Sequence, residues 1–257
     1  MMDRGLHTSV DGFLNNSFDV IQPLEGAHRS GLDALLLAAA IPEQATGRLA
    51  DFGAGCGVAG MAVAQRCQAV SVDLIEIEPS LVELASQTLA LPKNQHFASR
   101  IKLLGADISL TGERRLASGL GENQYDHMIA NPPYNPGSHQ QSPNKSRAQS
   151  HVMEEGLLLA WIKTAAVVAK PKATITLILR TESLSEILST FGNRFGSVRI
   201  LPIHPTAKAP SNRIIVSAIS TGKAALKILP QLNIHEVDGT FTKEAEAIFR
   251  GHAGLSF

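Results

Sequence analysis

Three glycines separated by single residues constrain the fold of this chain more than any other feature. The segment Asp51-Phe52-Gly53-Ala54-Gly55-Cys56-Gly57 follows a short apolar run and precedes an apolar helical pattern. Glycine allows the backbone to turn sharply and lets another group approach it closely. A strand, a tight turn and a helix in this order are typical of an α/β fold built on a parallel sheet.

Apolar runs of strand length alternate with helical patterns over much of the chain. Nearly continuous apolar strands between helices favour a mostly parallel sheet covered by helices on both faces. A polar connection is expected at 112–124. We expect strands at Leu49–Phe52, Ala69–Ile75, Ile101–Leu104, Tyr125–Ala130 and Ala173–Leu179, and helices at Leu32–Ile41, Val58–Arg66, Pro79–Leu91 and His151–Val168.

The composition narrows the class of protein. The chain has 257 residues, 44% of them hydrophobic, which suffices for the core of a single domain spanning 1–257. No apolar run reaches the length of a membrane span, and the first residues do not resemble a secretory signal. Two cysteines, Cys56 and Cys67, are too few for a disulfide framework or a metal cluster. We therefore expect a cytoplasmic protein without a bound metal.

The charges are divided unevenly along the chain. Residues 1–126 hold nine Lys and Arg against fifteen Asp and Glu, whereas residues 127–257 hold fourteen against eight. The stretch Ile187–His235 contains no acidic residue. Such asymmetry suggests either that a polyanion meets the C-terminal half or that this half has an ordinary solvated basic surface.

The glycine loop predicts a site for a nucleotide or a carboxylate. A helix N-terminus after the loop offers free N–H groups and a partial positive charge. Glu76, at the end of the next predicted strand, can accept hydrogen bonds from ribose hydroxyls, and Asp107, after the following strand, can accept from an adenine amine. The spacing Gly55, Gly57, Gly60 also fits a dinucleotide fingerprint, so an NAD-dependent oxidoreductase stays open at this point.

A second motif, Asn131-Pro132-Pro133-Tyr134, follows the strand Tyr125–Ala130. It is expected at the carboxyl edge of the sheet, where ligands bind in open α/β folds. The prolines fix φ and remove N–H donors, so the Asn131 side-chain oxygen and the Pro132 carbonyl can face outward as acceptors. Two such acceptors can hold the hydrogens of an exocyclic amine, and Tyr134 offers a flat face on which a base can stack.

Together these motifs resemble those of the class I amino-methyltransferases that carry N-P-P-Y. The chain is most similar to the bacterial tRNA (adenine-N6)-methyltransferases that modify the residue next to the anticodon of a valine tRNA. The segments Ile21–Pro23, Leu32–Ala38 and His204–Arg213 also resemble that family. The resemblance implies a Rossmann-like fold with a seven-stranded, mostly parallel sheet, and S-adenosylmethionine (SAM) as cofactor.

The resemblance also implies roles for individual residues. It implies that Asn131, Pro132, Pro133 and Tyr134 act in catalysis and base recognition. It also implies that Lys208 and Arg213 contact RNA. The residues implied to bind SAM are Asp51, Gly53, Ala54, Gly55, Gly57, Glu76, Asp107 and Ile108. Residues 1–45 are expected to form an extension on the cofactor and substrate side, and 135–150, which is almost devoid of apolar side chains, a mobile loop.

The same N-P-P-Y motif serves enzymes with other acceptors. Methylation of a glutamine amide in a protein such as a release factor, or of guanine N2 in ribosomal RNA, remains an alternative, as does an RNA-binding module without turnover. Two single residues receive structural interpretations: His127 is expected to be packed in its strand without a catalytic role, and Trp161 to belong to the core.

Overall fold

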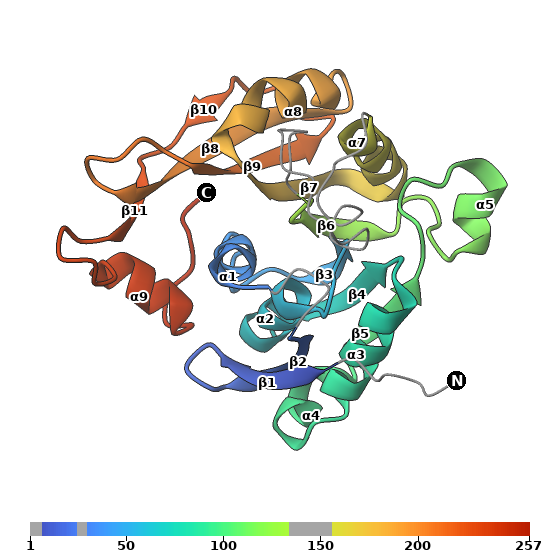
Figure 1. The fold of residues 1–257 in the computed structure, drawn as a ribbon. Coiled ribbons are helices and arrows are strands. Elements are labelled where there is room, and N and C mark those ends of the chain that lie inside the picture. The colour runs from blue at the N-terminus through green and yellow to red at the C-terminus, as the bar shows by residue number, and fades with distance from the viewer. Residues whose placement is uncertain (1–6, 25–29, 134–155) are drawn as a thin grey trace, which may run out of the picture.

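The computed structural model describes residues 7–24, 30–133 and 156–257. A large sheet runs through the molecule in the order β10-β8-β9-β7-β6-β3-β4-β5, and β11 pairs with β8 (Figure 1). Its strands are β3 (Gly47–Phe52), β4 (Val70–Glu76), β5 (Ile101–Gly105), β6 (Tyr125–Ala130), β7 (Ala169–Leu179), β8 (Phe195–Thr206), β9 (Arg213–Ser220), β10 (Lys227–Ile228) and β11 (Leu232–His235).

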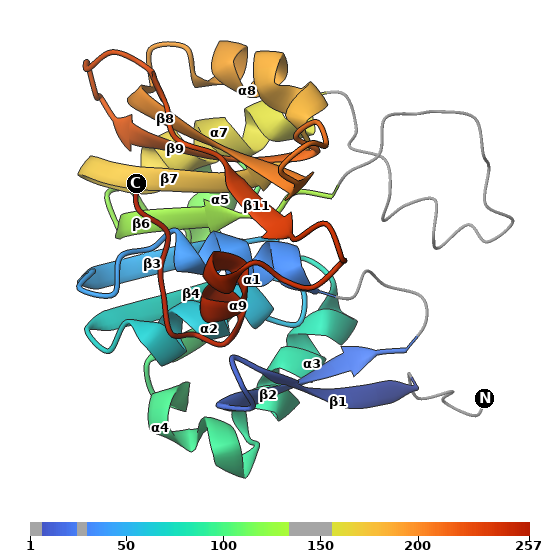
Figure 2. The same ribbon diagram turned by 90° about the vertical axis from the view of Figure 1, so that its left-hand side faces the viewer.

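Helices cover both faces of this sheet, as the sequence predicts. Figure 2 shows α1 (Leu32–Ala39), α2 (Val58–Arg66) and α9 (Lys243–Phe249) on one face. The other face carries α7 (Leu157–Val168) and α8 (Leu184–Phe191). The remaining helices are α3 (Pro79–Leu89), α4 (Gln95–Ala98), α5 (Gly112–Ala117) and the short 3₁₀ turns η1 (Pro92–Asn94) and η2 (Thr181–Ser183). No helix in the described ranges combines the length and apolar character needed to cross a membrane.

The strand count differs from the expected seven. Seven longer strands follow the order β8-β9-β7-β6-β3-β4-β5, and all pair in parallel except β9, which is antiparallel to β7 and β8. Two short strands, β10 and β11, are added in parallel along β8, giving a nine-stranded sheet. Pro230 lies between them and has no N–H to continue a ladder, which explains why the added edge is divided in two.

Several predicted boundaries also shift. The strand expected at Ala173 begins at Ala169, where it pairs with Tyr125. An irregularity follows, since Lys172 has a φ of 66° and the pairing resumes only at Thr174, opposite His127. The connection 112–124 contains the short helix α5, and the helix expected to reach Leu91 ends at Leu89. The helix expected from His151 is described only as α7, since 151–155 lie outside the described residues.

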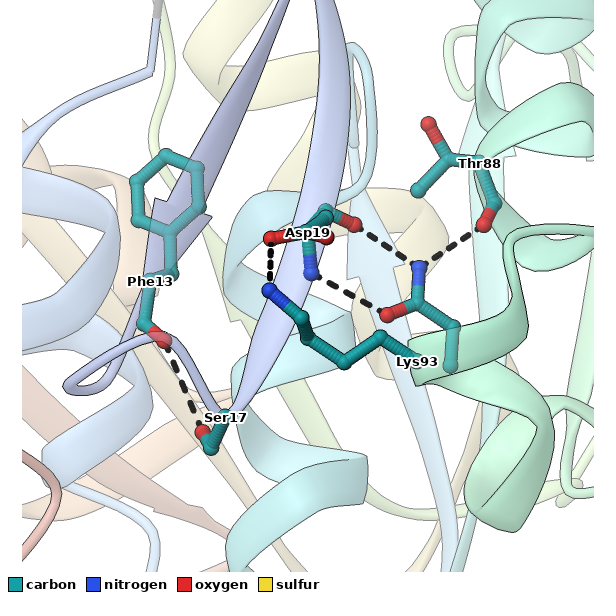
Figure 3. Close-up of polar contacts among 6 residues, drawn as sticks. Phe13, Ser17, Asp19, Thr88 and Lys93 are labelled. Carbon is teal, nitrogen blue, oxygen red and sulfur yellow. Dashed lines mark hydrogen bonds and ion pairs between the residues drawn. The ribbon is translucent and has the colours of Figure 1, made fainter.

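The first described segment forms a hairpin that the sequence did not predict. Its strands are β1 (Thr8–Phe13) and β2 (Phe18–Pro23), and the turn places three consecutive residues, Leu14 to Asn16, in the left-handed region. The hairpin docks through a buried amide (Figure 3). The Asn94 Nδ2 atom donates to the carbonyls of Asp19 and Thr88, both at 2.7 Å, and the Asp19 N–H donates to Asn94 Oδ1 at 3.1 Å.

Close contact between α2 and β4 depends on Gly60. A Cβ at this position would overlap the Leu74 side chain and lie 3.0 Å from Val72 Cγ1 and from Asp51 Oδ2. The helix that follows the glycine loop therefore approaches the sheet more closely than a side chain at position 60 would allow.

We predict that Gly60→Ala lowers the free energy of unfolding by about 1–3 kcal/mol, because overpacking forces the helix away from the strand. Urea denaturation of the full chain measures the change. Gly105→Ala is the matched control, since a Cβ there meets nothing within 4 Å. Equal midpoints for the two variants would contradict the packing argument.

Candidate active site

The sheet register brings the predicted site residues to one edge. Phe52, the last residue of β3, lies opposite Ile75 of β4 on one side and Ala130 of β6 on the other. Glu76 in turn lies opposite Gly105 of β5. The residues that follow these strand ends, Gly53, Asp107 and Asn131, therefore emerge with Glu76 along the carboxyl edge, where α/β proteins bind their ligands.

The glycine loop has the geometry that its sequence predicts. Gly53, Gly55 and Gly57 all have positive φ, at 66°, 58° and 89°, a region that other residues rarely adopt. The first glycine lies against the indole of Trp161, since an added Cβ would be 2.7 Å from its Cη2 atom. At Gly55 a Cβ would meet nothing within 4 Å. The loop is thus supported from below at Gly53 and has an open face at Gly55.

Glu76 ties the loop to the end of β4. Its Oε2 atom accepts from the Gly55 N–H at 2.8 Å, and its Oε1 atom accepts from the N–H groups of Ile77 and Glu78, both at 2.9 Å. The sequence predicts ribose hydroxyls as its partners, whereas the structure shows that three backbone donors already hold this carboxylate. A carboxylate accepts about four hydrogen bonds, so Oε2 keeps capacity for a ligand hydroxyl.

Asp107 lies beside Glu76, after β5. Its Oδ1 atom accepts from the Ser109 N–H at 2.7 Å, in a local turn, and its Oδ2 atom has no hydrogen-bond partner among the described residues. Ile108 behaves differently: its side chain is buried, and its carbonyl accepts from Thr164 Oγ1 at 2.6 Å. The Ile108 side chain therefore belongs to the core.

Asp51 lies beneath the loop. It is only 2% exposed, and its Oδ2 atom accepts from the Gly60 N–H at 2.8 Å. Burial raises the pKa of Asp51 from its ordinary 3.8 to about 7; the Gly60 N–H opposes this rise and the negative charge of Glu76 adds to it. The sequence groups Asp51 with the cofactor contacts, but the structure gives it a role in joining the end of β3 to α2. Ala54 and Gly57 are also buried.

Asn131 is half-exposed at the end of β6, and its side chain makes no hydrogen bond with the described residues. Pro132 is buried and Pro133 half-exposed. Tyr134 and the predicted mobile loop 135–150 lie outside the described residues.

The two predicted RNA contacts also reach this edge, because β8 ends and β9 begins there. Lys208 is exposed, with no ion pair among the described residues. Arg213 Nε donates to Asp33 Oδ2 at 3.0 Å, so it joins β9 to α1. The loop between them is fixed by hydrogen bonds from Ser211 Oγ to the carbonyls of Ile203 and Arg213, at 3.0 and 2.8 Å.

Comparison with known proteins agrees with this geometry. The family model described as "Methyltransferase small domain" matches residues 30–160, slightly more than half of the chain. The chain belongs to this methyltransferase family.

Similar proteins align with most of the length of this methyltransferase. A tRNA1(Val) (adenine(37)-N6)-methyltransferase of Shewanella halifaxensis is 30% identical over 187 residues, 72% of each chain. A protein of the same name from Bacteroides fragilis is 26% identical, over 84% of this chain and 89% of its own. A crystal structure described as a predicted O-methyltransferase of Agrobacterium tumefaciens is 34% identical, with a TM-score of 0.76, covering 87% of this chain and 98% of that one.

The family membership settles the cofactor. The protein is a SAM-dependent methyltransferase, and the alternative of an NAD-dependent oxidoreductase, which the glycine spacing alone left open, is wrong. The open face at Gly55 and the acceptors of Glu76 and Asp107 fit a nucleoside with a ribose and an amine. When bound, SAM supplies a methyl group activated by its sulfonium. Within the described ranges, no three His, Cys, Asp or Glu side chains are grouped to hold a metal ion.

Sequence reasoning missed some residues of the site and interpreted others well. Ile77, which the sequence analysis did not single out, follows Glu76 directly and is 63% exposed, so it presents an apolar side chain at this edge. Trp161 is buried as predicted, yet it also supports Gly53. His127 is half-buried between Thr174 Oγ1 and the Thr46 carbonyl, and burial lowers its pKa, which agrees with the packed role predicted for it.

The pKa of Asp51 leads to a prediction about stability. Because the folded pKa is raised above 3.8, the folded protein binds more protons than the unfolded chain between pH 4 and 7, and this group reduces stability as the pH rises. Asp51→Asn cannot ionise, so its stability relative to the wild type should rise by a few kcal/mol over that interval, at about 1.4 kcal/mol per pKa unit. Urea titrations at several pH values measure the difference; parallel curves would contradict it.

Trp161 gives a second prediction, because it is the single tryptophan of the chain and contacts the glycine loop. Titration with SAM should change its fluorescence emission in a saturable way, whereas NAD should not. Trp161→Phe should abolish the signal. Calorimetric binding of SAM without any change in emission would show that the cofactor does not lie over Gly53.

Proposed function

We propose that this methyltransferase transfers the methyl group of SAM to the exocyclic N6 of an adenine in RNA, most specifically in a tRNA. The observation that carries the proposal is the state of Asn131. It is half-exposed beside the glycine loop, followed by two prolines, and without a hydrogen-bond partner in the described residues. The names of the Shewanella and Bacteroides relatives support the choice of tRNA and of adenine N6.

Methylation of an exocyclic amine depends more on hydrogen-bond acceptors for its N–H groups than on a general base. Its lone pair is delocalised into the ring, so it is a poor nucleophile. In the proposed reaction the Asn131 side-chain oxygen and the Pro132 carbonyl accept from its two N–H groups, which favours a more tetrahedral nitrogen and disperses the positive charge that develops on it. The target adenine leaves its own stack to reach this edge, and Tyr134 is proposed to stack on it.

The basic side chains of the same edge support an RNA substrate. Lys208 is exposed on the fixed loop between β8 and β9, and neither this loop nor the two strands it joins carries an acidic residue. Lysines and arginines placed in this way can neutralise phosphates, and binding then weakens as salt rises. A tRNA substrate also implies the cytoplasmic location that we propose. Both apolar clusters pack on the one sheet, which supports a single domain.

Asn131→Ala should reduce methyl transfer to tRNA by about 100-fold or more, the usual cost of losing a group that stabilises developing charge. The assay follows labelled methyl from SAM into an unmodified tRNA transcript, with nucleoside mass spectrometry to identify N6-methyladenosine. Asn193→Ala, an exposed asparagine beside the amino end of β8, is the matched control.

Two further measurements separate catalysis from folding. SAM affinity, read from Trp161 fluorescence, and the melting temperature should both be unchanged in Asn131→Ala. Wild-type transfer by this variant would contradict the role of Asn131. Transfer by the wild type to a protein glutamine, with none to any RNA, would contradict the proposed substrate.

A further inference from the structure

Arg180 is a charged residue whose polar contacts are incomplete. It follows β7 directly and is half-buried, and its Nε atom is buried without a hydrogen-bond partner. No ion pair involves it within the described part of the chain. A buried donor left without an acceptor is unfavourable, and more so when the group is charged, so such a guanidinium is stabilised when an acceptor arrives.

The strand register places Arg180 diagonally across from Asn131. Ala130 of β6 lies opposite Leu177 of β7, so Pro133 lies opposite Arg180 when the parallel register is continued. Ile129 and Ile178 face the same apolar cluster as α1, and side chains two residues further along a strand face the same side. Arg180 retains an extended backbone, with φ −66° and ψ 148°. Asn131 and Arg180 therefore belong to the same side of adjacent strands, offset by two residues, so that their Cα atoms lie about 8 Å apart diagonally.

The other neighbours of Arg180 are basic. Continuing the antiparallel register of β7 and β9, in which Leu179 lies opposite Ile214, places Arg180 opposite Arg213. The next residue, Thr181, donates from Oγ1 to the Ser211 carbonyl at 3.0 Å, which attaches the end of β7 to the loop that carries Lys208. Asp33, the acid that reaches Arg213, forms an ion pair with that residue and none with Arg180.

We propose that Arg180 binds a backbone phosphate of the RNA beside the target adenine, and so holds the nucleotide against Asn131. This inference rests on the proposed function. A guanidinium presents a planar set of donors that matches two phosphate oxygens, and a phosphodiester supplies both the acceptor and the negative charge that Arg180 lacks. Arg180 lies between the acceptors proposed for the adenine and the exposed lysine, along the path of a strand entering the site.

The carboxylate of SAM has similar chemistry, so the test distinguishes it from a phosphate. Arg180→Met removes the charge and keeps the length of the side chain. With SAM and an unmodified tRNA transcript, we expect the KM for tRNA to rise about tenfold, as when one charged hydrogen bond is lost. The slope of log affinity against log salt should fall in magnitude by about one. SAM affinity, measured by calorimetry, should stay unchanged.

Further variants exclude a purely structural role. The melting temperature of Arg180→Met should be equal to or above that of the wild type, because the unsatisfied buried donor is removed. Arg180→Lys should recover the salt slope but only part of the affinity, since it restores the charge without the planar donors. The control is Arg194→Met, the same change at an exposed arginine beside the opposite edge of the sheet, which should leave the KM for tRNA unchanged.

The outcomes separate the two proposals. If the wild-type protein methylates no RNA, the proposed function is wrong, and the role proposed for Arg180 is wrong as well. If the wild type methylates tRNA and Arg180→Met shows the same KM and salt slope, only the role of Arg180 is wrong. A loss of SAM affinity with an unchanged KM for tRNA would assign Arg180 to the cofactor carboxylate, and a lower melting temperature with unchanged kinetics would assign it to the fold.

Discussion

The carboxylate of Glu76 is the interaction on which the arrangement of the site depends. It accepts from a backbone N–H of the glycine loop and from two that lead into α3, so one side chain joins the ends of β3 and β4. A carboxylate that is only 9% exposed is tolerated when such donors compensate for its lost hydration. Glu76 therefore determines the separation of two loops, and Gly55 keeps its open face because the loop is held on the other side.

Polar side chains at the two ends of the sheet differ in how many hydrogen-bond partners they have within the described chain. Toward the amino end, Tyr125 Oη donates to Asp73 Oδ2 at 2.7 Å, Arg48 pairs with the same carboxylate, and Lys170 Nζ pairs with Asp126 at 2.7 Å. Burial raises the pKa of the Tyr125 hydroxyl, which therefore remains a donor. These networks are satisfied internally and brace the fold.

At the carboxyl edge, by contrast, polar groups are left without partners in the described chain. The Asn131 amide, the Lys208 ammonium and the Arg180 Nε are of this kind. Asn131 and Lys208 are accessible to water, whereas the Arg180 Nε is buried, and a buried donor without an acceptor lowers stability until a ligand supplies one. The amino end also has one such atom, since Gln124 Oε1, just before β6, is buried without a hydrogen-bond partner. The groups at the carboxyl edge differ from it in lying at the edge that carries the glycine loop.

Local patterns predicted the central part of the fold. The helix Val58–Arg66 and the strand Tyr125–Ala130 appear with the expected bounds, because glycines and apolar runs mark them in the sequence. The β1–β2 hairpin could not be recognised in this way, since its turn relies on left-handed residues other than glycine and its docking on Asn94, far along the chain. The same limit applies to the site.

Motifs indicated Asn131, Glu76 and Asp107, but tertiary contacts decide what each does. Asp51 joins α2 to β3 because Gly60 lies above it, and Arg180 gains significance only from the strands beside it. Motif spacing records which side chains are near a ligand site, whereas the state of their hydrogen bonds follows from packing between distant segments.

The buried amide of Asn94 has a consequence for shortened forms of the chain. Two of its three hydrogen bonds go to the backbone of Asp19, and Gln22 on the same strand accepts from the Ser30 N–H just before α1. A truncation that begins at α1 would leave the amide with a single bond, to Thr88 of α3, and would also remove the residue that positions the start of α1. The N-terminal hairpin is thus an integral brace for the methyltransferase fold and not a dispensable appendage.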